Sequence, residues 1–433
     1  MRNGAAERFT EIPARWCPFG AIGTERHRRD QEASMTRYEG PLQFPFASRH
    51  PLLPPDEYAH LRAEQPVARA TLANGHAVWL VTKHADVRTV LADPRFSREA
   101  ITRPNAPRLL PVAAGSKSIF VMDPPEHTRL RKLVGKAFTT RQVERLRPRV
   151  EQLADSMVSA MAAQGPPADV ITHLAQPLPI TVICDMLGVP RPDQQLFREW
   201  TDVMLSVSAR SSEEVSDAAG KLRRYLTGLI EAKQQDPADD LLTVLITARD
   251  EDDSLSTEEL IAFAETMLMA GYHATTSEIV HGLLTLTERP GAVRRLVEHR
   301  GELPLAVDEL LRYSQAGGGV GPIRIALQDM EIGGVKVRAG DAVLPCINSA
   351  NRDDSVFTDA EELDLTREPN PHLAFGHGIH RCLGAHLGRV ELTVALDRLL
   401  HHLGTFQLAV PAGELEWKPN RAFTRPETLP LQW

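Results

Sequence analysis

The sequence predicts one large domain that is mainly α-helical with small β-sheets. The chain has 433 residues, of which 42% are hydrophobic, so it can bury a large core. Long stretches repeat apolar residues with helical periodicity. No Pro/Gly/Ser-rich linker, low-complexity run or internal repeat divides residues 35–433. We therefore expect these residues to fold as a single domain.

Residues 1–34 differ from the rest of the chain. They are rich in Arg and Glu and lack helical periodicity, and Met35 follows them. This composition is typical of a disordered extension. We expect residues 1–34 to be such an extension or an over-long start of the reading frame.

The bulk properties exclude several classes of protein. The net charge of −8 argues against a nucleic-acid partner. No apolar run reaches the ~20 residues that span a bilayer, and the N-terminus has no signal-peptide core. The four cysteines are scattered and suggest no disulfide framework. We expect a soluble cytoplasmic monomer with no membrane partner.

The first element that suggests chemistry is a helix start in residues 123–131 (DPPEHTRLR). Asp123 can cap this helix, and Pro124 suits its first turn. His127 and Arg131 are four residues apart, so they share one helix face. Two cations on one face could bind two carboxylates, although a solvated basic face explains the pattern equally well.

Three further elements follow along the chain. Residues 260–287 predict a long helix with a polar notch at residues 270–276 (AGYHATT). Glu309 and Arg312 place opposite charges three residues apart in an apolar helix, a spacing that alone is typical of a weak surface salt bridge. Residues 329–337 (DMEIGGVKV) predict a hairpin that turns at two glycines.

The last element is the glycine-rich loop of residues 375–384 (FGHGIHRCLG), which places Cys382 before a helix that begins near Ala385. Backbone N–H groups and the helix dipole favour a thiolate there. Three interpretations compete: an inert buried cysteine, a zinc site and an axial ligand of haem iron.

The zinc interpretation would use residues of the same loop and the helix after it, namely His377, His380, Cys382 and His386. No C-x-x-C pair exists anywhere in the chain to support it. The haem interpretation also explains the glycines. Gly376 and Gly378 permit positive φ and a close backbone approach, and Gly384 leaves no side chain beside the ring.

These ten residues match the pattern F-G-x-G-x-H-x-C-x-G at every fixed position. The chain therefore resembles the cytochrome P450 family, and in particular the soluble bacterial haem-thiolate monooxygenases of actinomycete natural-product pathways. The resemblance covers about residues 36–433, with the motifs in the family's order. It implies the cytochrome P450 fold, with haem b between the long central helix and the cysteine loop.

The resemblance assigns roles to named residues. Cys382 is implied as the iron ligand. The other implied cofactor-binding residues are His127, Arg131, Arg324, Phe375, His380 and Gly384. A buried structural group is implied for Glu309, Arg312 and Arg367, the last of which closes the segment Asp364-Leu365-Thr366-Arg367.

The notch departs from the family's pattern Ala-Gly-x-acid-Thr-Thr, in which the acid and the first threonine deliver protons for cleavage of the O–O bond. Counting from Gly271, His273 takes the acid position and Ala274 the threonine position. In one explanation Ala274 faces the iron, and protons come from ordered water, from a substrate hydroxyl or from His273. In the other, a π-bulge absorbs one residue and Thr275 recovers the role. We favour the first, and His273 can also be a buried structural histidine.

The resemblance places the substrate among residues 99–118, 197–212, 317–320 and 422–424. The glycines of residues 317–319 suit a medium-to-large substrate. The chain has no flavin or iron–sulfur segment. Electrons should therefore come from NAD(P)H only indirectly, through ferredoxin reductase and a ferredoxin that docks on a basic patch including Arg131, Arg381 and Arg389.

Three functions remain open at this point. The first is oxidation, chiefly hydroxylation, of a secondary metabolite by an enzyme of EC 1.14 type. The second uses the same haem for non-hydroxylating oxidative coupling or ring formation. The third, from another class, is a haem-binding sensor without turnover.

Overall fold

The computed structural model describes residues 42–433 except 108, 110–117, 205–210, 248, 251–252, 318–320 and 418–422. The predicted extension of residues 1–34 lies outside the described residues, as do parts of the segments expected around the substrate. Residues 43–433 form one unit, and the description below concerns that unit.

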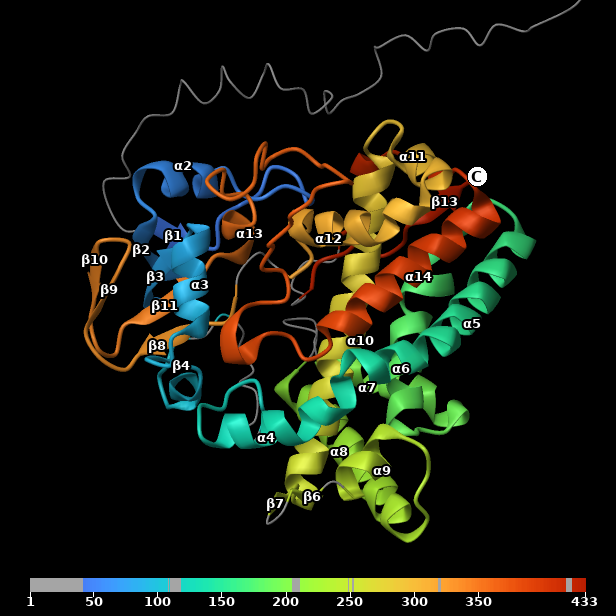
Figure 1. Cartoon of the computed structure of the whole chain (residues 1–433), viewed down its shortest axis with the longest axis horizontal. Helices are drawn as coiled ribbons and strands as arrows, with labels where there is room; N and C mark the ends of the chain where they lie inside the picture. The colour runs from blue at the N-terminus through green and yellow to red at the C-terminus, as the bar shows by residue number, and fades with distance from the viewer. Residues whose placement is uncertain are drawn as a thin grey trace, which may run out of the picture. The chain divides into compact units, whose positions relative to one another are not determined.

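Helices make up most of the regular structure (Figure 1). The α-helices are α2 (Glu57–Glu64), α3 (His84–Ala92), α4 (Glu126–Gly135), α5 (Thr140–Gln164), α6 (Pro177–Leu187), α7 (Gln194–Met204), α8 (Ser212–Gln235), α9 (Leu241–Thr247), α10 (Thr257–Thr287), α11 (Ala292–Glu298), α12 (Leu303–Tyr313), α13 (Ile347–Ala350) and α14 (Ala385–Leu403). Short helical turns are η1 (Glu99–Thr102), η2 (Lys136–Phe138), the π-helical η3 (Ile171–Ala175), η4 (Arg191–Asp193), η5 (Arg300–Glu302), η6 (Gly378–His380) and η7 (Ala412–Glu414).

The strands are short and form small sheets. They are β1 (Leu42–Phe44), β2 (Val67–Leu72), β3 (Ala77–Val81), β4 (Phe96–Ser97), β5 (Ala168–Asp169), β6 (Arg249–Asp250), β7 (Asp253–Ser254), β8 (Arg324–Ala326), β9 (Met330–Ile332), β10 (Val335–Val337), β11 (Ala342–Pro345), β12 (Gln407–Leu408) and β13 (Pro430–Gln432). The largest sheet has the order β1-β2-β3-β11-β8-β4. Its β3–β11 pair is parallel, with Leu80 opposite Leu344. The predicted hairpin is confirmed, since β9 and β10 pair antiparallel around Gly333 and Gly334.

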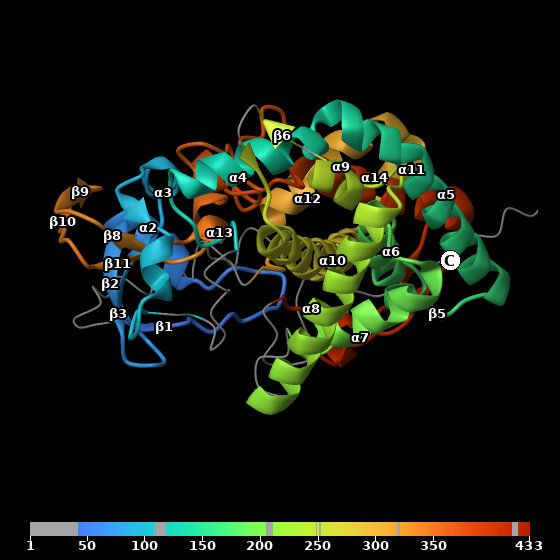
Figure 2. The same ribbon diagram turned by 90° about the horizontal axis from the view of Figure 1, so that it is seen from below.

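The long helix α10 passes among the other helices, and Figure 2 shows several of them around it. It packs against α6, α8, α12 and α14. The predicted helix begins three residues earlier than expected because Ser256 and Glu259 form a capping box at its N-terminus. Most of its side chains are buried on all faces, as expected of a helix in the interior of a large protein.

A large and a smaller hydrophobic cluster of described residues stabilise the unit. The larger one joins α5, α6, α10, α12 and α14 through residues such as Val150, Leu283 and Leu399. The smaller one lies between the main sheet and α3 and includes Val81, Val87 and Val343. The cysteine loop reaches both regions, because η6 contacts α3 and the loop leads directly into α14. Among the described residues, no helix is long and apolar enough to cross a bilayer.

Candidate active site

The loop before α14 folds back on itself. The backbone N–H of Cys382 donates to the carbonyl of Phe375 at 2.8 Å. Gly376 and Gly378 both have positive φ, at 68° and 71°. A Cβ at Gly378 would lie 2.6 Å from Ala92 Cα, so this glycine is needed for the loop to approach the end of α3. At Gly384 a Cβ would meet nothing within 4 Å, and φ there is an ordinary −84°.

Cys382 is accessible to solvent, although protein atoms surround most of its thiol group. Burial raises its pKa, while the N–H of Gly384 and the guanidinium groups of Arg131, Arg381 and Arg389 act to lower it. The expected stabilisation of the thiolate by backbone and cations is therefore present but does not outweigh burial.

The zinc interpretation finds no support. Among the described residues, no group of three or more His, Cys, Asp or Glu side chains could hold a metal ion. His386 turns away from the loop and hydrogen-bonds Glu144 through Nε2 at 2.8 Å.

A cluster of two arginines and two histidines lies beside the loop, and we call it the cationic cluster after its two guanidinium groups. It comprises Arg98, His127, Arg324 and His380. The rings of His127 and His380 lie 4.1 Å apart, centroid to centroid. Arg98, His127 and Arg324 are buried, and Arg324 is only 2% exposed. Four elements far apart in the sequence therefore converge here: the residue before η1, α4, β8 and η6.

Each member of the cationic cluster has a buried polar atom without a hydrogen-bond partner. These atoms are Arg98 Nε, His127 Nδ1, Arg324 Nη1 and His380 Nε2. Burial, followed by mutual repulsion, lowers the pKa of His127 to about 4 and that of His380 to about 2. Burial likewise lowers the pKa of Arg98 to about 10. Such a site is costly by itself and favours an anionic ligand.

Asp123 is the carboxylate that acts on this cluster, and its position corrects one expectation. It does not cap α4, which begins at Glu126 without a side-chain cap. Its side chain accepts instead from the backbone N–H of Arg98 at 2.8 Å and from the hydroxyl of Ser97. Asp123 thus fixes the chain that carries Arg98.

Arg131 takes a different place from His127, although both lie on one face of α4. Its Nη2 donates to the carbonyl of Arg381 at 2.6 Å. It therefore ties α4 to the cysteine loop directly. Phe375 lies under the guanidinium of Arg389, whose Cζ is 4.6 Å from the ring centroid, in the range of a cation–π contact.

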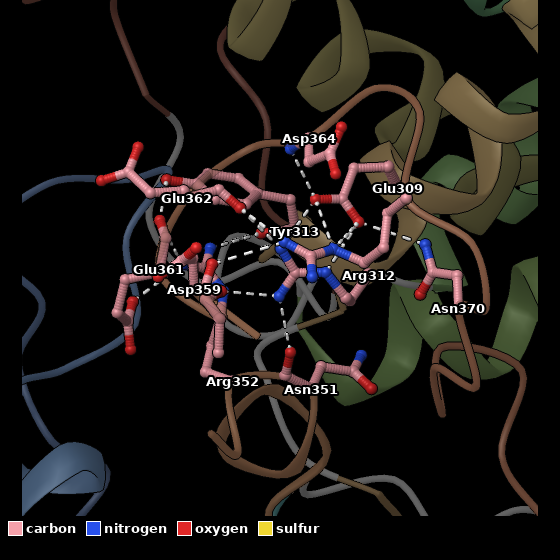
Figure 3. Close-up of polar contacts among 12 residues, drawn as sticks. Glu309, Arg312, Tyr313, Asn351, Arg352, Asp359, Glu361, Glu362, Asp364 and Asn370 are labelled. Atoms are coloured by element: carbon pink, nitrogen blue, oxygen red, sulfur yellow. Dashed lines mark hydrogen bonds and ion pairs between the residues drawn. The ribbon is translucent and has the colours of Figure 1, made fainter. Parts of the chain in front are cut away.

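The Glu309–Arg312 pair is fully buried rather than on the surface, and Figure 3 shows the polar contacts around it. Arg312 donates from Nε and Nη2 to the two carboxylate oxygens of Glu309, both at 2.8 Å. Its Nη1 donates to the carbonyls of Asn351 and Ala360 at 2.8 and 2.7 Å. This bidentate geometry with every donor used is the arrangement in which a buried ion pair can be retained.

Glu309 collects three further donors from the segment that precedes the cysteine loop. Arg367 Nε lies 3.1 Å from its Oε2, Asn370 Nδ2 lies 3.1 Å from the same atom, and the N–H of Asp364 lies 2.8 Å from Oε1. The structure thus brings Arg367 to the pair, where the resemblance implied a third partner. The network fixes the chain leading into residues 375–384.

The notch in α10 is α-helical throughout, and no π-helical segment occurs in residues 257–287. Thr266, Ala270, Ala274 and Glu278 are four residues apart and all partly exposed, so they form one stripe. Thr275 points elsewhere and is 9% exposed. The regular helix and the exposure of Ala274 support the explanation in which Ala274 faces the oxygen site.

His273 faces α7 rather than the exposed stripe. It is 7% exposed, and its Nε2 lies 3.6 Å from Oδ1 of Asp202. The Asp202 side chain is 40% exposed. The ring of Tyr272 packs against His273 at 4.2 Å between centroids. His273 therefore connects the notch to a carboxylate that reaches solvent.

Comparison with known proteins decides the family. The family model for cytochrome P450 matches residues 179–430. Nocardicin C N-oxygenase of Nocardia uniformis subsp. tsuyamanensis is 46% identical over 377 residues, 87% of this chain and 94% of that protein. The chain belongs to the cytochrome P450 family.

Other relatives agree with this assignment. Mycinamicin IV hydroxylase/epoxidase of Micromonospora griseorubida is 42% identical and covers 91% of this P450 and 99% of its own length. Among solved structures, the LnmA cytochrome P450 hydroxylase from the leinamycin pathway of Streptomyces atroolivaceus superposes with a TM-score of 0.86 at 43% identity, covering 90% of this chain and all of that one. These relatives are monooxygenases of natural-product pathways, and this chain is an oxidoreductase of the same type.

The family implies haem held by a cysteine thiolate, and this P450 has residues that fit it. Haem carries two propionates, and the cationic cluster offers four buried nitrogen atoms without partners, two of them on guanidinium groups. Gly384 leaves open space at the start of α14. The site therefore suits a flat dianionic group beside a thiol.

Sequence reasoning missed three residues at this P450's site. Arg98 lacked a motif, although its cluster contains three predicted members, His127, Arg324 and His380. Asp202 sits in an ordinary amphipathic helix and gains meaning only from its contact with His273. Glu278 lies one turn after Ala274, and its spacing from the notch was the available signal.

Proposed function

We propose that this P450 is a haem-thiolate monooxygenase in which Cys382 ligates the iron and the cationic cluster binds the propionates. The observation that carries the proposal is the set of four buried side-chain nitrogens without hydrogen-bond partners beside the cysteine loop. Such groups are expensive to bury unless an anion pairs with them. Phe375 and Gly384 shape the loop around the thiolate side of the haem.

When bound, haem with a thiolate ligand supplies the chemistry of O–O bond cleavage. The chain's residues supply protons and exclude water. Ala274 brings no hydroxyl to the oxygen side. His273 sets its Nε2 3.6 Å from the exposed carboxylate of Asp202, through which the imidazole exchanges protons with solvent. His273 on α10 and Asp202 on α7 thereby deliver the protons that the missing acid of α10 would supply.

Electrons come from NAD(P)H through ferredoxin reductase and ferredoxin. The ferredoxin docks over the cysteine loop, where Arg381 and Ile379 are exposed and Arg131 is partly exposed. The protein acts in the reducing cytoplasm as a monomer. The free state of Cys184, Cys346 and Cys382 supports that compartment.

The substrate is a medium-to-large secondary metabolite. Relatives include an N-oxygenase, a hydroxylase/epoxidase and a vitamin D(3) 25-hydroxylase, so insertion of one oxygen is the reaction the family comparison favours. Gly317 supports a roomy site, since it is exposed and a Cβ there would meet nothing within 4 Å.

The test is reconstitution with a plant-type ferredoxin, its reductase and NADPH. Compounds from a secondary-metabolite library that shift the haem spin state are incubated with this system, and the masses of the products are measured by mass spectrometry. A gain of one oxygen is the expected result. A loss of two hydrogens would indicate coupling or ring formation instead. Failure to consume NADPH with any such compound would point to a sensor.

A further inference from the structure

Glu278 is an acidic side chain in an unusual place. It lies in the middle of α10, one turn after Ala274 on the partly exposed stripe. Its neighbours from Thr275 to Ser277 and from Ile279 to Leu286 are buried. The stripe therefore reaches accessible space at Glu278, whereas the residues next to Glu278 along the helix are packed.

The stripe runs between two segments that the family places around the substrate. At one end, the hydroxyl of Thr266 lies 3.1 Å from that of Ser118. At the other end, Glu278 hydrogen-bonds the side chain of Ser314, the residue that follows α12. Thr424 joins this end, since its N–H donates to the carbonyl of Ala316 at 3.0 Å. Glu278 thus lies where α10, the residues after α12 and the C-terminal segment meet.

No described cation neutralises Glu278. It forms no ion pair with any residue that the structure describes, and Ser314 is its one side-chain partner there. His281, the next titratable group on the same helix, is held neutral. Its Nε2 hydrogen-bonds the carbonyl of Thr424 at 2.9 Å, and burial lowers its pKa to about 4.

This environment makes Glu278 costly as an anion. Burial raises its pKa to about 7, and the hydrogen bond with Ser314 only partly opposes that shift. A carboxyl poised between its neutral and charged forms becomes fully charged when a cation approaches it. The missing partner is supplied by a positively charged ligand more simply than by rearrangement of the packed helix.

We propose that Glu278 anchors a positively charged nitrogen of the substrate, so that this enzyme takes amine-bearing molecules. The proposal rests on the proposed function, because it places the amine within the substrate site of the same haem enzyme. The aliphatic surface of Ala270 and Ala274 on the same stripe accommodates the apolar part of such a molecule. Ser314 keeps the carboxyl oriented before the substrate arrives.

The experiment measures binding rather than turnover. Holoenzyme is first checked for its reduced carbon monoxide spectrum, so that a failure of the proposed function is seen separately. Trimethyl(4-phenylbutyl)ammonium, which cannot ligate iron through its nitrogen, is then titrated by calorimetry. The neutral probe is 4-phenylbutan-1-ol. Proteins compared are the wild type, Glu278→Gln and the control Glu265→Gln, a residue of α10 that pairs with Arg223.

The ammonium compound is expected to bind the wild type and Glu265→Gln equally, and Glu278→Gln about tenfold or more weakly, as loss of a charge-assisted contact implies. The alcohol should bind all three proteins alike. Titrations in two buffers of different ionisation enthalpy should show protons released on ammonium binding. The release should be larger at pH 6 than at pH 8 and absent in Glu278→Gln.

Three results would overturn the proposal. One is absence of ammonium binding to the wild type. Another is equal loss of ammonium and alcohol affinity in Glu278→Gln, which would make the residue structural. The third is unchanged ammonium affinity together with a lost pH dependence of turnover on neutral substrates, which would make Glu278 a proton donor.

Discussion

At the scale of single residues, the cationic cluster is electrostatically unfavourable until the propionates of haem neutralise it. Arg324 is buried beside Arg98, and its pKa is lowered well below the usual range because burial and that neighbour disfavour its charge. The cluster therefore destabilises the haem-free fold and favours the loaded one.

Arg324→Met is predicted to raise or preserve the melting temperature of haem-free protein but to weaken haem binding by about tenfold or more, the usual effect of one lost charged hydrogen bond. Melting of both forms and the rate of haem transfer to apomyoglobin measure the two effects. Arg338→Met, at an exposed position, is the control and should change neither. If haem-free Arg324→Met were less stable than the haem-free wild type and bound haem with normal affinity, the claim that the cluster destabilises the haem-free fold would be wrong.

A second residue-scale prediction concerns Thr275. Because α10 is regular and Ala274 lies on its exposed stripe, Thr275→Ala should cost far less than the ~10²-fold that loss of a general acid typically causes. Asp202→Asn should cost more, since it leaves His273 without its carboxylate. The ratio of product to hydrogen peroxide per NADPH measures both. Strong peroxide leakage in Thr275→Ala would restore the π-bulge explanation.

At the scale of elements, the network around Glu309 joins α12 to the chain before the cysteine loop. Arg312→Ala leaves the Glu309 carboxylate buried with fewer donors and should destabilise the fold by about 3–5 kcal/mol. Arg295→Ala, which breaks the exposed pair with Glu302, should cost about 1 kcal/mol or less. Urea denaturation of both variants gives the comparison. Similar costs would show that the buried network does not stabilise the unit.

The contact between η6 and the end of α3 gives another prediction. In Gly378→Ala both the positive φ and a clash with the backbone of Ala92 are unfavourable, whereas in Gly404→Ala only the positive φ is unfavourable. Haem content after purification should fall sharply only in Gly378→Ala. If both variants retained haem equally, the close approach to α3 would not be what requires this glycine.

At the scale of the whole molecule, the sequence predicts the motifs formed by adjacent residues. It does not predict the sites formed by residues that the fold brings together from distant parts of the chain. The loop of residues 375–384, the long helix and the β9–β10 hairpin carry their signals in a few adjacent residues. Arg98 and Asp202 carry none, and Glu278 carries only its spacing from the notch, because their roles arise from which helix or loop they meet. The buried state of Glu309 and Arg312 was likewise invisible in their spacing, which suits a surface pair equally well.

The segments expected around the substrate include residues 108, 110–117, 205–210, 318–320 and 422, which lie outside the described residues. The stripe on α10, whose residues are described, is the part of the expected substrate site on which specific predictions can be made. Binding of charged and neutral probes tests that stripe without knowledge of the natural substrate.

The most direct test of the central claim is the reduced carbon monoxide difference spectrum of the wild type and of Cys382→Ser. The wild type should show the thiolate-ligated Soret band, and Cys382→Ser should lose that band even where it still binds haem. Cys184→Ser, a buried cysteine away from the loop, is the control and should keep the band. A thiolate spectrum that survives in Cys382→Ser would contradict the assignment of the iron ligand.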